Sequence, residues 1–117
     1  MEADLKRGDV VLVNLDPTID SETGKARPCV IIQNNVGNKY SPVTIVAVIT
    51  SQKRISQKYP VDVWIEMEEG DLDVPSIIQL DQIRTVDKKR FVMKVGHLSD
   101  PVMKEVDEAI KISLALD

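Results

Sequence analysis

The sequence predicts a mainly β domain, built as a small barrel or a strongly twisted sheet with one helix at its C-terminal end. Apolar residues make up 43% of the chain but aromatic residues only 3%, so the core must consist mostly of Val, Ile and Leu, and β-branched side chains pack well on a pleated surface. Several short apolar runs alternate with turn residues, and only the last apolar segment has helical spacing. The length of 117 residues suits a single domain over residues 1–117.

The apolar runs predict six strands, at residues 10–15, 28–33, 43–50, 61–66, 76–86 and 92–98. Asp16-Pro17 ends the first strand and opens a long polar loop, of the kind that is often functional in compact domains. Residues 34–38 are rich in Asn and Gly, which tolerate left-handed backbone, and predict a turn. Strand 43–50 reads as buried on both faces, and strand 76–86 is long enough to bend.

The C-terminal segment has the features of an amphipathic helix. Asp100 is the expected N-cap and Pro101 the first helical residue. Apolar residues then recur at a spacing of three to four, at Val102, Val106, Ala109, Ile110 and Leu114. We expect this stripe to pack on the sheet.

Composition bounds the cellular setting and the partners. The net charge is −4, yet residues 1–60 hold eight basic against six acidic side chains and residues 61–117 hold seven against thirteen. A local basic groove is therefore compatible with the acidic total, although ordinary charge scatter explains the asymmetry as well. Cys29 is the single cysteine, which favours a reducing, cytoplasmic setting. No signal-peptide pattern or membrane-length apolar run is present in the sequence.

Two residue types suited to phosphate chemistry flank the second and third strands. Arg27 ends the polar loop, and its guanidinium can donate bidentate hydrogen bonds to phosphoryl oxygens. Thr50 ends the third strand, and its β-branched side chain holds the hydroxyl in place. Together they could hold a phosphate without a metal. Taken alone, Arg27 could equally form a surface salt bridge to Asp20 or Glu22, and Thr50 could be an ordinary strand residue.

Short segments in a fixed order carry a family resemblance: Arg7-Gly8-Asp9-Val10, Asp16-Pro17, Ser21-Glu22, Arg27-Pro28, Gln33-Asn34, Thr50 and Asp81-Gln82-Ile83-Arg84-Thr85. Through them the sequence resembles the MazF/PemK family of toxin endoribonucleases, the mRNA interferases of type II toxin–antitoxin systems. Ile32-Gln33-Asn34 and the ending Ile112-Ser113-Leu114-Ala115-Leu116 resemble its Gram-positive-type branch. The resemblance covers nearly the whole chain.

The resemblance implies an SH3-like small β-barrel with a C-terminal helix packed on it, working as a cytoplasmic homodimer. It implies ribosome-independent and metal-independent cleavage of single-stranded mRNA at a short motif, with a UACAU-like pentanucleotide suggested by the branch. It also implies a cognate antitoxin whose disordered C-terminal segment occupies the groove. Arg27 and Thr50 are the catalytic pair by this resemblance, with no cofactor and no metal.

The general base is less clearly marked, because arginine is a poor proton acceptor. Glu22 in the same loop is the candidate for base or loop organiser, although a solvated loop carboxylate is an equally good interpretation. RNA binding needs cations and polar groups, for which the candidates are Arg7, Asn34, Ser51, Gln52, Lys53 and Gln82. Cys29 is expected to be an inert core residue. His97 is expected to be structural or partly exposed, because no carboxylate is spaced to partner it.

Two other functions remain compatible with such a chain. A gyrase-poisoning toxin of the CcdB type shares the fold by analogy, and a non-catalytic SH3-like binding module needs no reactive residues. Both would leave RNA intact. RNA cleavage in the presence of EDTA, lost in Arg27→Ala and Thr50→Ala, would separate the endoribonuclease from both.

Overall fold

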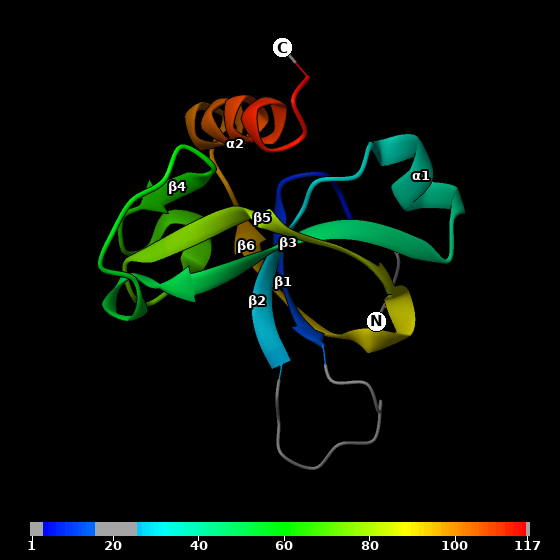
Figure 1. Ribbon diagram of the computed structural model, residues 1–117. Coiled ribbons are helices and arrows are strands. Elements are labelled where there is room, and N and C mark those ends of the chain that lie inside the picture. Colours follow the sequence, from blue (N-terminus) through cyan, green and yellow to red (C-terminus); the bar gives the residue numbers. More distant parts are fainter. Residues whose placement is uncertain (1–3, 16–25, 117) are drawn as a thin grey trace.

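The computed structural model of the protein describes residues 4–15 and 26–116 (Figure 1). Six antiparallel strands form one sheet in the order β4-β5-β3-β2-β1-β6. The strands are β1 (Asp9–Asn14), β2 (Ala26–Ile31), β3 (Val43–Ser51), β4 (Asp62–Ile65), β5 (Ser76–Asp87) and β6 (Phe91–His97). The helices are α1 (Asn35–Tyr40) and α2 (Asp100–Ser113), with the 3-10 turns η1 (Gln52–Arg54), η2 (Glu69–Asp71) and η3 (Lys88–Arg90). The predicted mainly β class with a C-terminal helix is confirmed.

The long strand β5 allows the sheet to curl. Ala47 of β3 pairs with Ile83, but the next residue, Val48, pairs with Gln79, so residues 80–82 form a bulge. Such bulges bend a strand and increase its twist. The strands at the two ends of the sheet, β4 and β6, do not pair with each other, so the sheet is curled and barrel-like but is not closed by hydrogen bonds.

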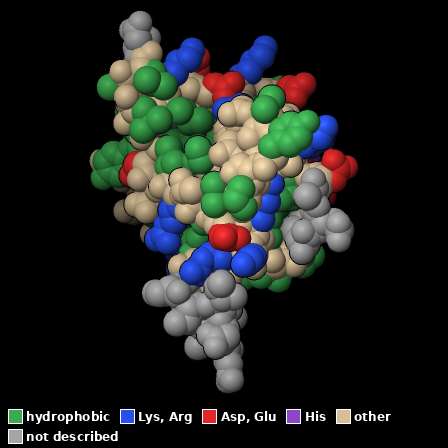
Figure 2. Space-filling model, turned by 90° about the vertical axis from the view of Figure 1, so that its right-hand side faces the viewer, with side chains coloured by type: hydrophobic (Ala, Val, Ile, Leu, Met, Phe, Trp, Pro, Cys, Tyr) green, Lys and Arg blue, Asp and Glu red, His purple; other side chains and the backbone are tan. Residues whose placement is uncertain are grey.

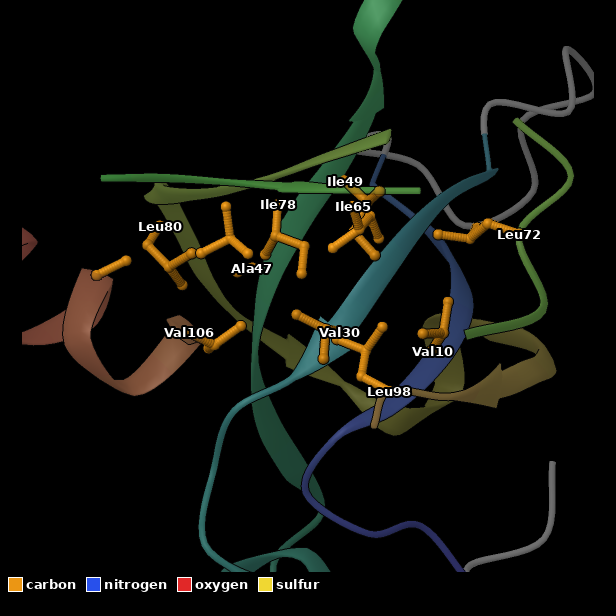
Figure 3. Close-up of a cluster of buried hydrophobic side chains, with 12 residues drawn as sticks. Val10, Val30, Ala47, Ile49, Ile65, Leu72, Ile78, Leu80, Leu98 and Val106 are labelled. Atoms are coloured by element: carbon orange, nitrogen blue, oxygen red, sulfur yellow. The ribbon is translucent and has the colours of Figure 1, made fainter. Parts of the chain in front are cut away.

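The curled sheet has a hydrophobic cluster on each face. Figure 3 shows the larger one, in which Val10, Val30 and Ile78 from three strands meet Leu98 and Val106. The second cluster, on the opposite face, contains Val11, Val13, Cys29, Ile31, Val46, Val48, Val86 and Phe91. Both faces of β3 are therefore largely covered, as its continuous apolar pattern predicts.

The turn η2 lies against the edge strand β6 and partly closes the gap between the sheet edges. A Cβ added at Gly96 would come within 2.3 Å of the Gly70 carbonyl oxygen. Gly70 itself has φ of +66°, and a Cβ there would meet Leu98 at 2.8 Å. Only glycine fits this contact without displacement of backbone or core, so the pair fixes where the η2 segment sits.

The helix α2 packs on the sheet through Val106 and Ala109, which are buried in the larger cluster. Val102 and Ile110 are partly buried against the same cluster, as predicted, but Leu114 forms the exposed C-cap. The N-cap position belongs to Ser99 and not to Asp100, which is the first helical residue. Within the described residues, no helix is long and apolar enough to cross a membrane.

The predicted turn at residues 34–38 is instead the start of the short helix α1. Asn34 caps this helix by accepting a hydrogen bond from the Gly37 amide at 2.8 Å. Asn38 is buried, and its side chain bonds the Thr44 hydroxyl and the Gln33 carbonyl. The buried amide network outweighs the local turn preference of Asn and Gly.

Candidate active site

Arg27 and Thr50 lie on the same face of the sheet. Cys29 of β2 pairs with Val48 of β3, and Ile31 pairs with Val46. Because alternate residues of a strand point to one face, Arg27 follows Cys29 and Thr50 follows Val48 onto that face. Continuing this register by two further pairs, beyond the paired part of the two strands, would put Arg27 across from Thr50.

Both residues line one surface pocket of about 380 Å³ at the ends of β2 and β3. Its described lining comes from β2, β3, η1 and the segment that leads into β5: Ala26, Arg27, Pro28, Ile49, Thr50, Ser51, Arg54, Leu72, Asp73, Val74 and Ser76. The lining also has an apolar part, since Ile49 and Leu72 belong to the larger core cluster. We refer to this cavity as the Arg27 pocket.

The polar part of the Arg27 pocket holds charges that have no ion-pair partner among the described residues. Arg27, Arg54 and Asp73 are all exposed, and none of them forms a salt bridge with another described residue. The described lining therefore holds two guanidiniums, one carboxylate and the three hydroxyls of Thr50, Ser51 and Ser76. Such unneutralised guanidiniums are available to bind phosphate oxygens.

Sequence reasoning did not assign Arg54 or Asp73 to the site. Arg54 lies only four residues after Thr50, in a basic run that the 3-10 turn η1 folds back over the strand end. Asp73 belongs to an acidic loop whose charge pattern suggests only solvation. The closeness of Arg54 to Thr50 in the chain was a signal that could have identified Arg54. No local feature of the sequence identifies Asp73.

The thiol between the pocket and the core is inert. Burial raises the pKa of Cys29 to about 12, although the guanidiniums of Arg84 and Arg27 oppose the shift. The thiolate is the reactive form of cysteine. The prediction that Cys29 is buried is confirmed, and the raised pKa agrees with the expectation of an unreactive thiol.

Three of the predicted RNA-binding residues lie at the end of β3. Ser51 lines the Arg27 pocket, and its hydroxyl caps η1 by accepting from the Lys53 amide at 3.2 Å. Gln52 donates from its side-chain amide to the carbonyls of Ile65 and Ser76, at 3.1 and 3.3 Å. Lys53 is exposed next to the pocket but is not among its lining residues. The structure therefore brings these residues to the neighbourhood of Thr50.

The other three predicted RNA-binding residues lie elsewhere. Arg7 donates to Asp107 of α2 at 2.7 Å and to the Ile32 carbonyl at 2.8 Å, so it holds the helix against the end of β2. Asn34 is the cap of α1. Gln82 is exposed in the β5 bulge. None of the three lines the Arg27 pocket.

Glu22 lies outside the described residues, as does the rest of the loop from 16 to 25. Among the residues that the structure does describe, no three His, Cys, Asp or Glu side chains form a metal-binding cluster. His97 is half-exposed, as expected. The expectation that it has no carboxylate partner is wrong. Its Nδ1 lies 2.7 Å from the carboxylate of Asp9, which is 1% exposed and also pairs with Lys94 at 3.3 Å.

Figure 2 shows the distribution of charge on one face of the molecule. The basic side chains stand in several separate groups, with acidic side chains beside them, and they do not merge into one broad patch. Positive charge is therefore not a property of this whole face.

Comparison with known proteins extends these observations. Residues 6–114 match the family described as the PemK-like, MazF-like toxin of type II toxin–antitoxin systems. The chain is 47% identical over 112 residues to endoribonuclease EndoA of Bacillus subtilis, covering 96% of each protein.

Solved structures share the fold at lower identity. A mycobacterial endoribonuclease in complex with its cognate antitoxin has a TM-score of 0.79 at 20% identity, covering 97% of each chain. The Mycobacterium tuberculosis toxin MazF-mt6 has a TM-score of 0.77 at 23% identity, covering 93% of this chain and 98% of its own. The family match over almost the full length, and the close identity to a Gram-positive relative, lead to one conclusion: this chain belongs to the PemK-like, MazF-like family of type II toxin–antitoxin toxins.

Proposed function

We propose that the Arg27 pocket is the active site of a metal-independent, ribosome-independent endoribonuclease that cuts single-stranded mRNA at a short sequence. The chain is a toxin endoribonuclease by its family and by its identity to EndoA. The observation that carries the choice of site is that Arg27 and Thr50 share a sheet face and a pocket. Neither the gyrase-poisoning nor the non-catalytic alternative would require this pairing.

RNA supplies its own nucleophile, the 2′-hydroxyl, and attack on the adjacent phosphorus gives a 2′,3′-cyclic phosphate and a 5′-hydroxyl. Arg27 stabilises the extra negative charge of the phosphorane through its planar pair of donors. Thr50 donates to a phosphoryl oxygen or positions the 2′-oxygen, and its restricted χ1 limits the entropy lost on doing so. Arg54 offers a second guanidinium to the same or the neighbouring phosphate.

The residues that contact RNA outside the catalytic pair, and the role of Glu22 in the reaction, are part of the proposal. Ser51, Gln52 and Lys53 lie where nucleotides next to the cut would pass. Gln82 and Asn34 would have to bind bases farther along the strand, and Arg7 could do so only at the expense of its bonds to α2. Glu22 is proposed as the base or as the organiser of its loop, and a UACAU-like motif is proposed as the recognition sequence.

The partners follow from relatives that were solved as complexes. One solved structure is a mycobacterial endoribonuclease in complex with its cognate antitoxin, and another is the MazE–MazF complex of Deinococcus radiodurans. We infer that this toxin also binds a cognate antitoxin, with a disordered C-terminal antitoxin segment folding into the RNA groove. A homodimer in the cytoplasm is part of the same proposal.

The test is an assay of the purified protein on mixed single-stranded RNA in EDTA, with sequencing of the cut ends. We expect cleavage by the wild type, and a fall of about 10²–10³-fold in rate for Arg27→Ala, typical of losing one preorganised donor. Thr50→Ala should also lose cleavage. Lys89→Ala, which removes an exposed cation from η3, is the charge control and should cleave like the wild type.

Two results would overturn the proposal. One is cleavage that depends on a divalent ion, and the other is full activity of Arg27→Ala. RNA left intact by the wild type would favour the gyrase-poisoning or binding-module alternatives. The sequenced ends of the products would also give the recognition motif directly.

A further inference from the structure

We propose that Asp73, and not Glu22, is the general base that takes the proton from the attacking 2′-hydroxyl, which leaves Glu22 the role of loop organiser. The inference rests on the proposed function of the Arg27 pocket and names a residue that the reaction needs. It concerns a carboxylate in the segment that leads into β5, which lines the same pocket as Arg27 and Thr50.

The lining of the pocket leaves few groups that can accept a proton. Asp73 is the only carboxylate among the described lining residues, and that lining contains no histidine. The guanidiniums of Arg27 and Arg54 stay protonated at any working pH. The hydroxyls of Thr50, Ser51 and Ser76 are weak bases. An ionised carboxylate is an established acceptor in general base catalysis.

The backbone around Asp73 is held on both sides, which positions the carboxylate. Before it, Leu72 is buried and its carbonyl accepts from the Glu68 amide at 2.7 Å. After it, the Pro75 carbonyl accepts from the Gln52 amide at 3.1 Å, and Ser76 pairs with Ser51 in the sheet. The exposed Asp73 therefore extends from an anchored segment that is tied to the residue next to Thr50.

The charges of the pocket also call for a chemical role. Arg27 and Arg54 line the same pocket as Asp73, and Asp71 lies two residues before it on its own segment. An acidic group in a phosphate-binding pocket weakens the binding of an anion. Asp73 forms no ion pair with a described residue, so it does not serve to fix either arginine. A carboxylate placed there is explained by proton transfer.

The step balances without a further reactant. The 2′-oxygen forms a bond to phosphorus while its proton moves to the Asp73 carboxylate. The bond from phosphorus to the 5′-oxygen breaks, and that oxygen takes a proton from water. Asp73 then returns its proton to solvent, and the products are the cyclic phosphate and the 5′-hydroxyl.

The experiment compares Asp73→Asn with Asp71→Asn in single-turnover cleavage of an RNA that the wild type cuts. Asp71 is an exposed carboxylate that does not line the Arg27 pocket, and its φ of +62° is tolerated by Asn. General base catalysis contributes about 10²–10⁴-fold, so Asp73→Asn should slow cleavage by that factor. Asp71→Asn should cleave like the wild type.

Binding and pH dependence separate a base from a merely structural residue. Affinity is measured with the same RNA carrying a 2′-deoxy nucleotide at the cut, which cannot react. Asp73→Asn should bind this RNA at least as tightly as the wild type, because a negative charge is removed. The wild-type rate should fall on the acid side, because only the unprotonated form of a general base accepts a proton. This fall should disappear in Asp73→Asn and be restored in Asp73→Glu.

Glu22→Gln completes the design. The inference is overturned if Asp73→Asn cleaves at the wild-type rate, or if Glu22→Gln removes the acid-side fall while Asp73→Asn keeps it. In both cases cleavage that still depends on Arg27 would leave the proposed function standing. If the wild-type protein does not cleave RNA at all, the proposed function itself is refuted.

Discussion

Individual residues show how far their type alone determines their role. Arg27 and Thr50 could be selected from the sequence because guanidinium and hydroxyl groups suit phosphate and because their spacing matched a family. Arg54 could have been selected only from its closeness to Thr50 in the chain, and Asp73 could not be selected, since the segment 72–76 reaches the pocket only in the folded protein. His97 likewise contacts the carboxylate of Asp9, which lies near the other end of the chain. Long-range contacts of this kind leave no local pattern.

Cys29 gives a prediction at the residue scale. Its pKa is about 12 in the folded protein against an ordinary value of 9.0, mainly because burial disfavours the thiolate. The thiol should therefore react very slowly with a thiol reagent at pH 9 in the native protein and rapidly in urea, where it is half ionised. Since Cys29 is the only cysteine, the signal is unambiguous.

The same shift makes a prediction about stability. A raised folded pKa contributes stability that is complete below pH 9 and is lost as the pH rises from 9 toward 12. Urea unfolding at pH 7 and pH 10 should show a larger loss for the wild type than for Cys29→Ala. Equal losses, or fast modification of the native thiol, would show that the sulfur is solvated.

At the scale of elements, the sequence predicts strands better than it predicts their connections. The six strands follow from apolar runs, and the helix α2 follows from its spacing and from Pro101. The helix α1 was missed because its stability comes from a buried Asn38 bonded to Thr44, which belongs to another element. Its Asn and Gly content favours a turn when only neighbours are considered.

The attachment of α2 to the end of β2 gives the prediction at this scale. Arg7 bonds both Asp107 of α2 and the Ile32 carbonyl. Arg7→Ala should cost roughly 1–2 kcal/mol, because a charge-assisted donor to a carbonyl is also lost, and Asp107→Ala should cost less. A double-mutant cycle should give a coupling of about 0.5 kcal/mol, since the pair is partly exposed.

Urea unfolding measures these free energies, and RNA binding provides the comparison. If Arg7 primarily contacts RNA, Arg7→Ala would keep full stability and lose affinity. That outcome would restore the sequence-based interpretation of Arg7 and refute the attachment described here.

At the scale of the whole molecule, the packing of η2 against the edge strand β6 depends on a contact between two glycines that no pattern in the sequence predicts. The class, the strand number and the terminal helix are predictable because they follow from periodicity. The meeting of η2 with β6 at Gly70 and Gly96 is not predictable from it, because the two glycines are distant in sequence and neighbours only in the folded chain.

Gly96→Ala tests this contact. Its Cβ would meet the Gly70 backbone at 2.3 Å, so η2 or β6 must move, at an expected cost of about 1–3 kcal/mol or more. The melting temperature should fall accordingly. Val92→Ala, at an exposed position of the same strand, is the control and should change stability little. An unchanged melting temperature in Gly96→Ala would mean that the contact is not tight.

The glycine contact also bears on heat sensitivity of the reaction. Asp73 follows Gly70 by three residues, and Gly70 packs against Gly96 of β6. The position of this part of the pocket lining therefore depends on the contact with β6. Loosening at this junction would widen the cavity before the strands separate. On warming, RNA cleavage should therefore stop at temperatures where circular dichroism still shows an intact sheet. Gly96→Ala should lower the temperature at which cleavage stops.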